Sequence, residues 1–219
     1  FLKEIKNFNS IAFIGGGAGS VELALALKKR LKDTNKNFEI TIVSGKNGIL
    51  SSFPKKTKQI SLNALREANI KLIDNKEVVQ VKKDKLIMSD GSFLNVEKSI
   101  LSTNAMAPKW IEKSDIKLNE DSFIVVNDAF QTNHKFIFAA GDIVDFNKEN
   151  LKKTGVFAVR SGKPLAKSIR NYILNYKNFT YKFNKHYLSL LGLSNGMAIA
   201  SKYNFSYSTK LNFYLKKYI

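Results

Sequence analysis

The sequence predicts an α/β protein with a parallel sheet and a small antiparallel meander. Residues 11–27 indicate a short buried strand, a glycine-rich turn and a small apolar helix, which together open a βαβ unit. Residues 38–43 supply the next strand, at about the distance along the chain that such a unit requires. Residues 77–96 form short extended runs with turn signals, where a second crossover helix would otherwise be expected.

The glycine-rich turn fits the dinucleotide-binding fingerprint, with Gly15, Gly17 and Ser20 at its three positions. Gly15 allows a tight turn, and Gly17 lacks the Cβ that would obstruct a pyrophosphate. Position 20 must be small so that helix and strand pack closely, and Ser20 departs slightly from the usual Gly or Ala. A glycine-rich turn without a ligand is the alternative. We expect the whole turn to bind a nucleotide at the helix N-terminus: Gly15, Gly16, Gly17, Ala18, Gly19 and Ser20.

The loop after the second strand is where such a unit usually carries an Asp or Glu for the ribose 2′-hydroxyl. Ser44 occupies the expected place, and Lys46 follows it. Without the carboxylate, a preference for NAD is not supported. Lys46 could suit a 2′-phosphate, or it could be an ordinary solvated lysine. We include Ser44 and Lys46 among the candidate cofactor-binding residues.

The other elements of this first domain follow in order. A helix is expected at residues 55–69 after Pro54, and an apolar strand at residues 70–73. Asp90-Gly91 is a strong hairpin signal within the meander. A core strand at residues 99–103 then returns the chain to the sheet. We expect three segments: a connection from an upstream segment at 1–10, a dinucleotide-binding domain at 11–108, and a further domain at 109–219.

A second informative stretch lies in that further domain. Residues 123–128 and 136–143 indicate two apolar strands that flank a polar turn, and the second ends in Ala140-Gly141-Asp142. A carboxylate just after a buried strand and a glycine can accept hydrogen bonds from a sugar or ribityl hydroxyl. Asp142 could equally be a helix N-cap. The local sequence leaves both interpretations open.

Composition narrows the class of protein. The chain has 219 residues, which suffice for one large or two small domains, and an ordinary hydrophobic content of 44%. We find no run of about 18 apolar residues and no secretory signal. The absence of cysteine excludes disulfides and thiolate metal sites within this chain, so we expect a cytoplasmic protein. His134 and His186 stand far apart, and we expect packing or surface roles for them and no metal site.

The charge is strongly positive, with 36 Lys and Arg against 18 Asp and Glu. Such a surface could attract nucleic acid, an anionic membrane or anionic cofactors. The lysines are scattered along the chain without a single dense block, which favours a generally solvated surface. We therefore expect no nucleic-acid partner.

The order of these motifs resembles the pyridine nucleotide-disulfide oxidoreductase superfamily. The glycine turn, the meander, Ser102-Thr-Asn-Ala-Met-Ala-Pro108 and Phe136-Ile-Phe-Ala-Ala-Gly-Asp142 carry the resemblance. The closer match is the disulfide-free branch, the single-subunit NADH dehydrogenases. The resemblance implies a Rossmann-like nicotinamide-binding domain, with a parallel sheet and an antiparallel meander. It also implies that the C-terminal half of a second Rossmann-like domain, which binds FAD, follows.

The resemblance also implies roles for single residues. The turn at Gly15 would hold NAD(P)H, and Gly141 with Asp142 would match the second FAD motif. Asn104 and Ala105 occupy a turn where the family usually has Ala-Thr-Gly, and they depart from its glycine. Glu22 would lie near the nicotinamide and flavin as a candidate catalytic residue. Its alternative is a first-turn carboxylate that complements the helix dipole.

The C-terminal stretch narrows the resemblance. Residues 153–166 resemble the family helix that begins against the flavin, which implies a contact from Gly155, Val156 and Phe157. Residues 187–191 and 197–201 resemble the paired strands that follow. This version is similar to the oxidoreductase domain that occurs fused to selenide, water dikinase, although no kinase residues are present. The tail at 211–219 could touch a membrane surface or simply pack.

Together these features imply an FAD-dependent NAD(P)H oxidoreductase. Hydride would pass from the nicotinamide to the flavin and then to a small acceptor such as a quinone. We find one glycine turn where the family has two, so we expect that the N-terminal FAD-binding half lies upstream or is supplied by a partner. The alternative is a non-catalytic nucleotide-binding or interaction module that has lost FAD binding.

Overall fold

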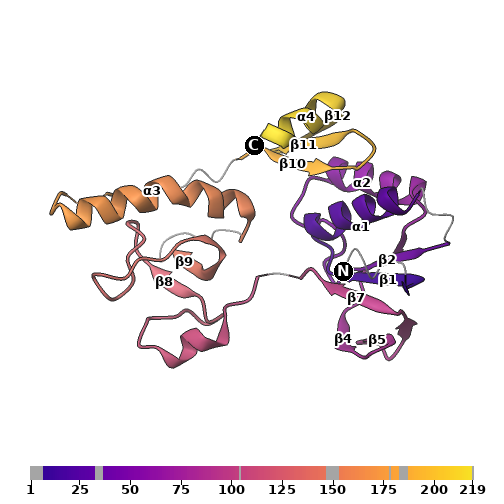
Figure 1. Cartoon of the computed structure of the whole chain (residues 1–219), viewed down its shortest axis with the longest axis horizontal. Coiled ribbons are helices and arrows are strands. Elements are labelled where there is room, and N and C mark those ends of the chain that lie inside the picture. Colours follow the sequence, from indigo (N-terminus) through magenta and orange to yellow (C-terminus); the bar gives the residue numbers. More distant parts are fainter. Residues whose placement is uncertain are drawn as a thin grey trace. The chain divides into compact units, whose positions relative to one another are not determined.

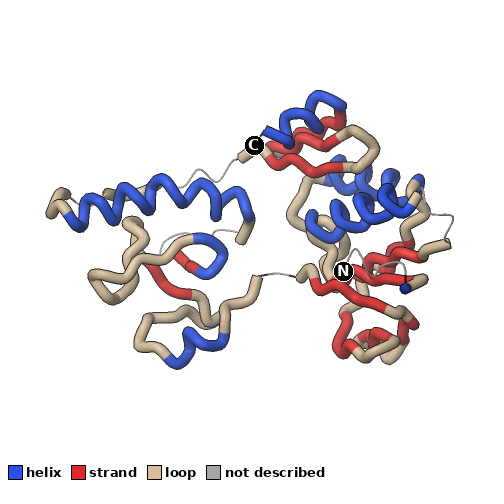
Figure 2. Tube along the Cα trace, in the orientation of Figure 1, coloured by secondary structure: helices blue, strands red, loops and turns tan. Residues whose placement is uncertain are grey.

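A computed structural model describes residues 7–32, 37–103, 105–146, 153–177, 179–182 and 187–218. The chain divides into two compact units (Figures 1 and 2). Unit 1 comprises Phe1–Thr103 together with Leu188–Ile219, and unit 2 comprises Asn104–Tyr187. Among the described residues, no helix is long and apolar enough to cross a membrane.

Unit 1 is built on a four-stranded parallel sheet in the order β3-β2-β1-β7. The central strand β1 is almost wholly buried, as its continuous apolar run predicts. The helices α1 and α2 provide the crossovers between β1, β2 and β3. The elements are β1 (Ser10–Ile14), α1 (Ala18–Leu31), β2 (Glu39–Val43), α2 (Lys55–Glu67), β3 (Lys71–Ile73) and β7 (Lys98–Leu101).

Alternation along β1 divides the core between the two faces of this sheet. Ile11 and Phe13 belong to the core that α1 and α2 cover, whereas Ala12 and Ile14 pack with residues of the antiparallel meander. The meander consists of β4 (Val78–Val81), β5 (Lys85–Met88) and β6 (Phe93–Asn95), which pair antiparallel. The predicted sheet and meander are therefore confirmed.

The β5–β6 hairpin closes at the predicted Asp90-Gly91 turn. Gly91 has a φ of +81°, which favours glycine. The Asp90 carboxylate lies 2.6 Å from the Lys76 ammonium and accepts hydrogen bonds from the backbone N–H and hydroxyl of Ser92. These donors hold the pKa of the Asp90 carboxyl well below its usual range.

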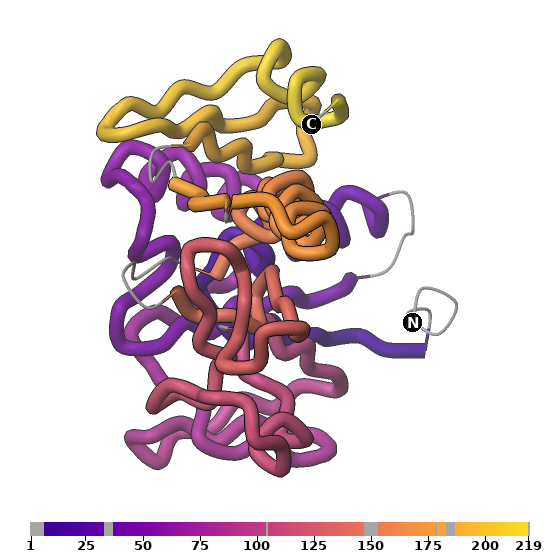
Figure 3. Tube along the Cα trace, turned by 90° about the vertical axis from the view of Figure 1, so that its left-hand side faces the viewer, coloured from indigo at the N-terminus to yellow at the C-terminus, as the bar shows by residue number. Residues whose placement is uncertain are grey.

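The C-terminal segment belongs to unit 1 and forms a further layer on its helices (Figures 1 and 3). It consists of β10 (Ser189–Gly192), β11 (Ala198–Lys202), β12 (Phe205–Thr209) and α4 (Lys210–Tyr218). Leu191, Leu193 and Ile199 join the same core cluster as the buried residues of α1 and α2. The Thr57 hydroxyl of α2 contacts the Ser201 and Ser206 hydroxyls at 3.1 and 2.6 Å.

This arrangement corrects the expected grouping of residues 109–219 into one domain. Residues 188–219 cluster with unit 1, because their buried side chains complete the core on the outer face of α1 and α2. The paired strands expected at 187–191 and 197–201 are present as β10 and β11. The strand β12 was not expected, and it buries Ser206 while Phe205 and Tyr207 are exposed.

Unit 2 contains a two-stranded parallel sheet and one long helix. Its elements are η2 (Lys109–Lys113), β8 (Ile124–Val126), η3 (Gly141–Ile143), β9 (Val144–Phe146) and α3 (Gly155–Ile173). Phe130 is fully buried at the centre of its core, and its ring meets Phe146 edge-on at 5.3 Å. The core is small, since the sheet has two strands.

The strand expected at residues 136–143 is wrong. Phe138 makes only an isolated antiparallel bridge to Gln131, and Gly141 begins a short 3₁₀ helix. The left-handed φ of Gly141, +84°, breaks the extended run, and the strand that pairs with β8 follows it as β9.

Candidate functional site

The glycine turn after β1 is held against two neighbouring strands. Gly15 has a φ of +123°, and its N–H donates to the Val43 carbonyl oxygen at 2.8 Å. A Cβ at Gly15 would overlap the Ser102 carbonyl oxygen and lie 2.7 Å from the carbonyl carbon. A Cβ at Gly16 would lie 2.7 Å from the Ser44 Cβ. The fold itself therefore requires glycine at positions 15 and 16.

Gly17 differs from these two glycines, because no atom lies within 4 Å of the position that its Cβ would take. Gly17 is the N-cap of α1 and is exposed, with a φ of −75° that other residues also adopt. The open space therefore lies beside the first N–H groups of the helix, where the macrodipole favours an anion. This cradle fits the pyrophosphate of a dinucleotide.

The other residues of the turn support this geometry. Ser20 is fully buried, as the packing of helix against strand requires, and its hydroxyl has no hydrogen-bond partner among the described residues. A Cβ at the exposed Gly19 would come within 3.3 Å of the Ser102 hydroxyl. Ala18 begins α1 and packs against the helix-side core. The structure therefore brings all six predicted residues of the turn together.

The loop at residues 44–50 lies directly against the glycine turn. The Leu50 N–H donates to the Gly16 carbonyl oxygen at 2.7 Å. Ser44 is buried, and its hydroxyl donates to Asp74 Oδ1, which also accepts the Ile49 N–H at 2.9 Å. Asp74 follows β3, and sequence reasoning missed its role because the contact spans 30 residues.

The two lysines beside this loop differ in exposure. The side chain of Lys46 is 81% exposed and lies 3.7 Å from a Glu77 carboxylate oxygen. The side chain of Lys58, in the first turn of α2, is 36% exposed, and its ammonium lies 4.0 Å from Asp74 Oδ2. Lys58 is a second residue that sequence reasoning missed, because it reaches the loop only through the packing of α2.

Glu22 does not lie in the first turn of α1, so its alternative role as a first-turn carboxylate is wrong. It is the fifth residue of α1, and the first turn of that helix contains no acidic residue. Its Oε1 accepts the Gly192 N–H of β10 at 2.5 Å and forms an ion pair with the Lys216 ammonium of α4. Lys216 also donates to the Leu190 carbonyl oxygen at 2.8 Å. Within unit 1, Glu22 therefore fastens the C-terminal layer to α1.

Replacing Glu22 with alanine is expected to lower the free energy of unfolding of unit 1 by about 1–2 kcal/mol, after allowance for its partial exposure. The change leaves the Gly192 N–H and the Lys216 ammonium without their acceptor. Urea unfolding followed by circular dichroism measures this, and Glu67→Ala, at an exposed carboxylate of α2, is the control. Equal free energies of unfolding for the two variants would show that the contacts of Glu22 do not stabilise unit 1.

The predicted flavin-side residues lie together in unit 2. η3 packs against α3, and a Cβ at Gly141 would contact the Ala158 Cβ at 3.9 Å. Asp142 is exposed beside this contact. Thr154 is the N-cap of α3, and its hydroxyl accepts the Phe157 N–H at 3.5 Å.

Open space lies beside the first turn of α3. Gly155 is exposed, and no atom lies within 4 Å of its Cβ position, so the first turn of α3 can approach a polar ligand. Val156 and Phe157 complete that turn and are half-buried. Ala105 is exposed, whereas its neighbour Asn104 lies outside the described residues.

Lys153 precedes the N-cap of α3 and is a residue that sequence reasoning missed. Its ammonium donates to the Val144 carbonyl oxygen, lies 3.9 Å from Asp145 Oδ1 and stands 4.4 Å from the centroid of the Phe123 ring. Burial lowers the pKa of the Lys153 ammonium below 10.5, although Asp145 and Asp142 oppose that shift.

The lowered pKa of Lys153 predicts a pH dependence of stability. The unfolded chain binds more protons than the folded chain between the folded pKa and 10.5, so the free energy of unfolding rises with pH in that window. The rise is at most about 1.4 kcal/mol per pH unit. Urea unfolding of unit 2, followed by Trp110 fluorescence, measures it. Lys153→Met should remove this rise, whereas Lys163→Met, at an exposed position of α3, should retain it; identical pH profiles would contradict the assignment.

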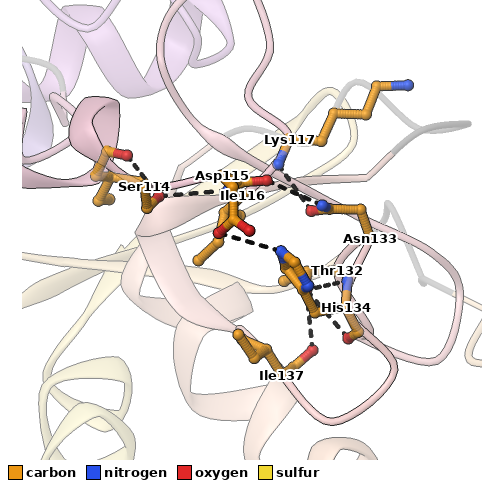
Figure 4. Close-up of polar contacts among 9 residues, drawn as sticks. Ser114, Asp115, Ile116, Lys117, Thr132, Asn133, His134 and Ile137 are labelled. Atoms are coloured by element: carbon orange, nitrogen blue, oxygen red, sulfur yellow. Dashed lines mark hydrogen bonds and ion pairs between the residues drawn. The ribbon is translucent and has the colours of Figure 1, made fainter.

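His134 contacts the neighbouring segment at Asp115 (Figure 4). Its Nε2 lies 3.3 Å from Asp115 Oδ1, and its ring lies 6.0 Å from that of Phe136. Asn133 also contacts the segment that carries Asp115. Its side chain accepts the Lys117 N–H and donates to the Asp115 carbonyl oxygen. The described residues contain no group of three or more His, Asp or Glu that could hold a metal ion. His186 lies outside the described residues.

Comparison with known proteins agrees with this geometry. A type II NADH:quinone oxidoreductase of Haemophilus influenzae is 25% identical over 213 residues, which are 91% of this chain and 48% of that protein. A probable NADH dehydrogenase of Dictyostelium discoideum is 24% identical over 179 residues, which are 77% of this chain and 40% of that protein. The chain therefore spans about half the length, or less, of these curated relatives.

Solved structures share the fold. The sulfide:quinone oxidoreductase of the hyperthermophilic bacterium Aquifex aeolicus matches 99% of this chain and 58% of its own, with a TM-score of 0.74 and 19% identity. Reduced CoADR-RHD of Bacillus anthracis matches 91% of this chain and 36% of its own, with a TM-score of 0.70 and 19% identity. The predicted α/β, Rossmann-like fold class is confirmed.

A family model also matches the chain over residues 1–162, and it describes pyridine nucleotide-disulphide oxidoreductases. FAD and NAD(P)H are the cofactors of that family, as the sequence resemblance implied. The match covers the glycine turn of unit 1 and both the Gly141 turn and the start of α3 in unit 2. The chain therefore belongs to the pyridine nucleotide-disulphide oxidoreductase family.

Proposed function

We propose that this chain is part of an FAD-dependent NAD(P)H oxidoreductase similar to the NADH dehydrogenases. The observation that carries the proposal is the glycine turn of unit 1, which leaves an open cradle at Gly17 beside the N-terminus of α1. Hydride transfer from nicotinamide to flavin is the chemistry that the bound cofactors would supply. The name of the Haemophilus influenzae relative supports a quinone-like acceptor for the electrons.

The residues of the chain would bind and orient these cofactors. The first N–H groups of α1 would hold the pyrophosphate of NAD(P)H, and the 44–50 loop would border its adenosine ribose. In unit 2, Asp142 would accept hydrogen bonds from ribityl hydroxyls. The first turn of α3, at Gly155 and Val156, would direct its N–H groups towards the flavin.

The visible absorption spectrum tests this proposal. The purified chain is saturated with FAD, freed of excess flavin, and then mixed anaerobically with NADH or NADPH. A retained flavin band that bleaches on mixing supports the proposal. A retained band that neither nucleotide bleaches would contradict it.

A non-catalytic nucleotide-binding or interaction module is the second candidate. The engagement of Glu22 by Gly192 and Lys216 favours it, because that carboxylate has a structural role within unit 1. The departure from glycine at Ala105 favours it as well. Its signature is dinucleotide binding, measured by calorimetric titration, without FAD retention in the absorption experiment.

We propose that a further segment or a partner chain completes the FAD-binding part. The sheet of unit 2 has two parallel strands, whereas parallel sheets are ordinarily larger and covered on both faces. Val159 and Ile173 of α3 are 78% and 69% exposed, so α3 offers apolar surface for such an addition. Tight FAD retention by this chain alone, as a monomer, would contradict this requirement and would leave the oxidoreductase proposal standing.

We also propose a cytoplasmic protein with a peripheral membrane contact through β12 and α4. Residues 187–219 contain four lysines and no acidic residue. The exposed large side chains of this layer include Phe205 (83%), Leu211 (75%) and Tyr218 (88%). Aromatic and basic groups on one surface favour anionic membranes. Co-sedimentation with phosphatidylglycerol vesicles, but not with phosphatidylcholine vesicles, is expected; equal behaviour would count against the contact.

A further inference from the structure

The loop that borders the ribose position presents no carboxylate of its own. Residues 44–50 contain no Asp or Glu, and the Ser44 side chain is buried. The carboxylate that is present nearby, Asp74, comes from beyond β3 and is engaged from within the loop. Its Oδ1 accepts both the Ser44 hydroxyl and the Ile49 N–H. Through these two contacts Asp74 positions the loop.

Two cations lie near the same loop. The position of a Cβ on Gly48 lies 3.2 Å from the Lys58 ammonium and 3.3 Å from Asp74 Oδ1, so an ammonium and the carboxylate that positions the loop both lie beside its backbone. Lys46 is part of the loop and is largely exposed. Its partner Glu77 is 3.7 Å away and more than half exposed, so this pair is weak and can exchange for a stronger anion.

A ribose with a free 2′-hydroxyl prefers a carboxylate acceptor, whereas a 2′-phosphate prefers ammonium or guanidinium groups. We propose that this site takes the 2′-phosphorylated dinucleotide, NADPH, and that Lys46 and Lys58 contact the 2′-phosphate. The inference rests on the proposed nucleotide-binding function of unit 1 and specifies its substrate. Asp74 supports this arrangement through two contacts. It accepts the Ser44 hydroxyl, and its Oδ2 lies 4.0 Å from the Lys58 ammonium, which is itself beside Gly48.

Calorimetric titration of the whole chain with 2′,5′-ADP and with 5′-AMP tests the inference without any flavin chemistry. The two probes differ only in the 2′-phosphate. The chain is expected to bind 2′,5′-ADP at least tenfold more tightly, and NADP⁺ more tightly than NAD⁺. Lys46→Gln and Lys58→Gln should each weaken 2′,5′-ADP binding by roughly tenfold, since each removes a charged hydrogen-bond donor. Affinity for 5′-AMP should change less than twofold.

Lys56→Gln is the matched control, because it removes the same charge from an exposed position in the first turn of α2. It should leave the preference for 2′,5′-ADP unchanged. Equal affinities of the native chain for the two probes would overturn the inference. An equal loss of both probes in Lys58→Gln would show that Lys58 only supports the loop through Asp74, which also overturns its assigned role.

The outcomes separate this inference from the proposed function. If the chain binds NAD⁺ as tightly as NADP⁺, the proposed nucleotide site stands and only the proposed preference for NADPH is wrong. If the chain binds neither nucleotide, both the site and the preference are wrong. Failure of NADH and NADPH to bleach bound FAD counts against the oxidoreductase proposal and leaves the 2′-phosphate measurement intact, because both adenosine probes lack a nicotinamide.

Discussion

Gly15→Ala is expected to destabilise unit 1 by about 3 kcal/mol or more. Two costs combine: the left-handed φ of +123°, and a Cβ that would overlap the Ser102 carbonyl group. The atoms nearest to that Cβ position are backbone atoms of Ser102 and Thr103, directly after β7. No side-chain rotation can therefore relieve the overlap. The sheet must separate locally, and nucleotide binding is expected to be lost with it.

Urea unfolding followed by circular dichroism measures this loss. Gly91→Ala is the matched control, because Gly91 also has a left-handed φ, +81°, but no atom lies within 4 Å of its Cβ position. The control should cost about 1 kcal/mol, which is the backbone strain alone. Equal costs for Gly15→Ala and Gly91→Ala would show that the approach to Ser102 is not tight.

Gly17→Ala is expected to have the opposite pattern, with binding lost and stability kept. The Gly17 φ of −75° suits alanine, and the Cβ would enter open space. The poorer N-cap and the reduced entropy of the unfolded chain act in opposite directions, so stability should change by less than about 1 kcal/mol. Affinity for NADP⁺ and NAD⁺ should fall roughly tenfold or more, since the new methyl group occupies the cradle beside the helix N-terminus.

Calorimetric titration with both dinucleotides, beside urea unfolding of the same samples, distinguishes binding from folding. Gly162→Ala provides a control, because Gly162 also has open space at its Cβ position but lies within α3 of unit 2. Undiminished binding in Gly17→Ala would mean that the pyrophosphate does not approach α1 at this point.

Local features of the sequence predicted the framework of unit 1. A buried strand needs a continuous apolar run, and a tight turn at a helix N-terminus needs glycine, so residues 11–27 specify β1, the turn and α1. The Asp90-Gly91 signal likewise specifies its hairpin through residues that are adjacent in the chain. The strand expected at 136–143 is interrupted by the left-handed Gly141, although Phe138 and its neighbours pack against the core of unit 2. The missed strand at 205–209 has exposed aromatic side chains at Phe205 and Tyr207.

The sequence by itself therefore determined the fold class, the family and the position of the glycine turn, because each depends on neighbouring residues or on the order of motifs. Only the tertiary structure decided what single polar groups do. Ser44 meets Asp74 across 30 residues, and Glu22 meets Lys216 across 194. Packing of whole elements creates such contacts, since α4 on β10 and β11 brings Lys216 to Glu22, and β3 beside β2 brings Asp74 to Ser44. No local periodicity encodes them.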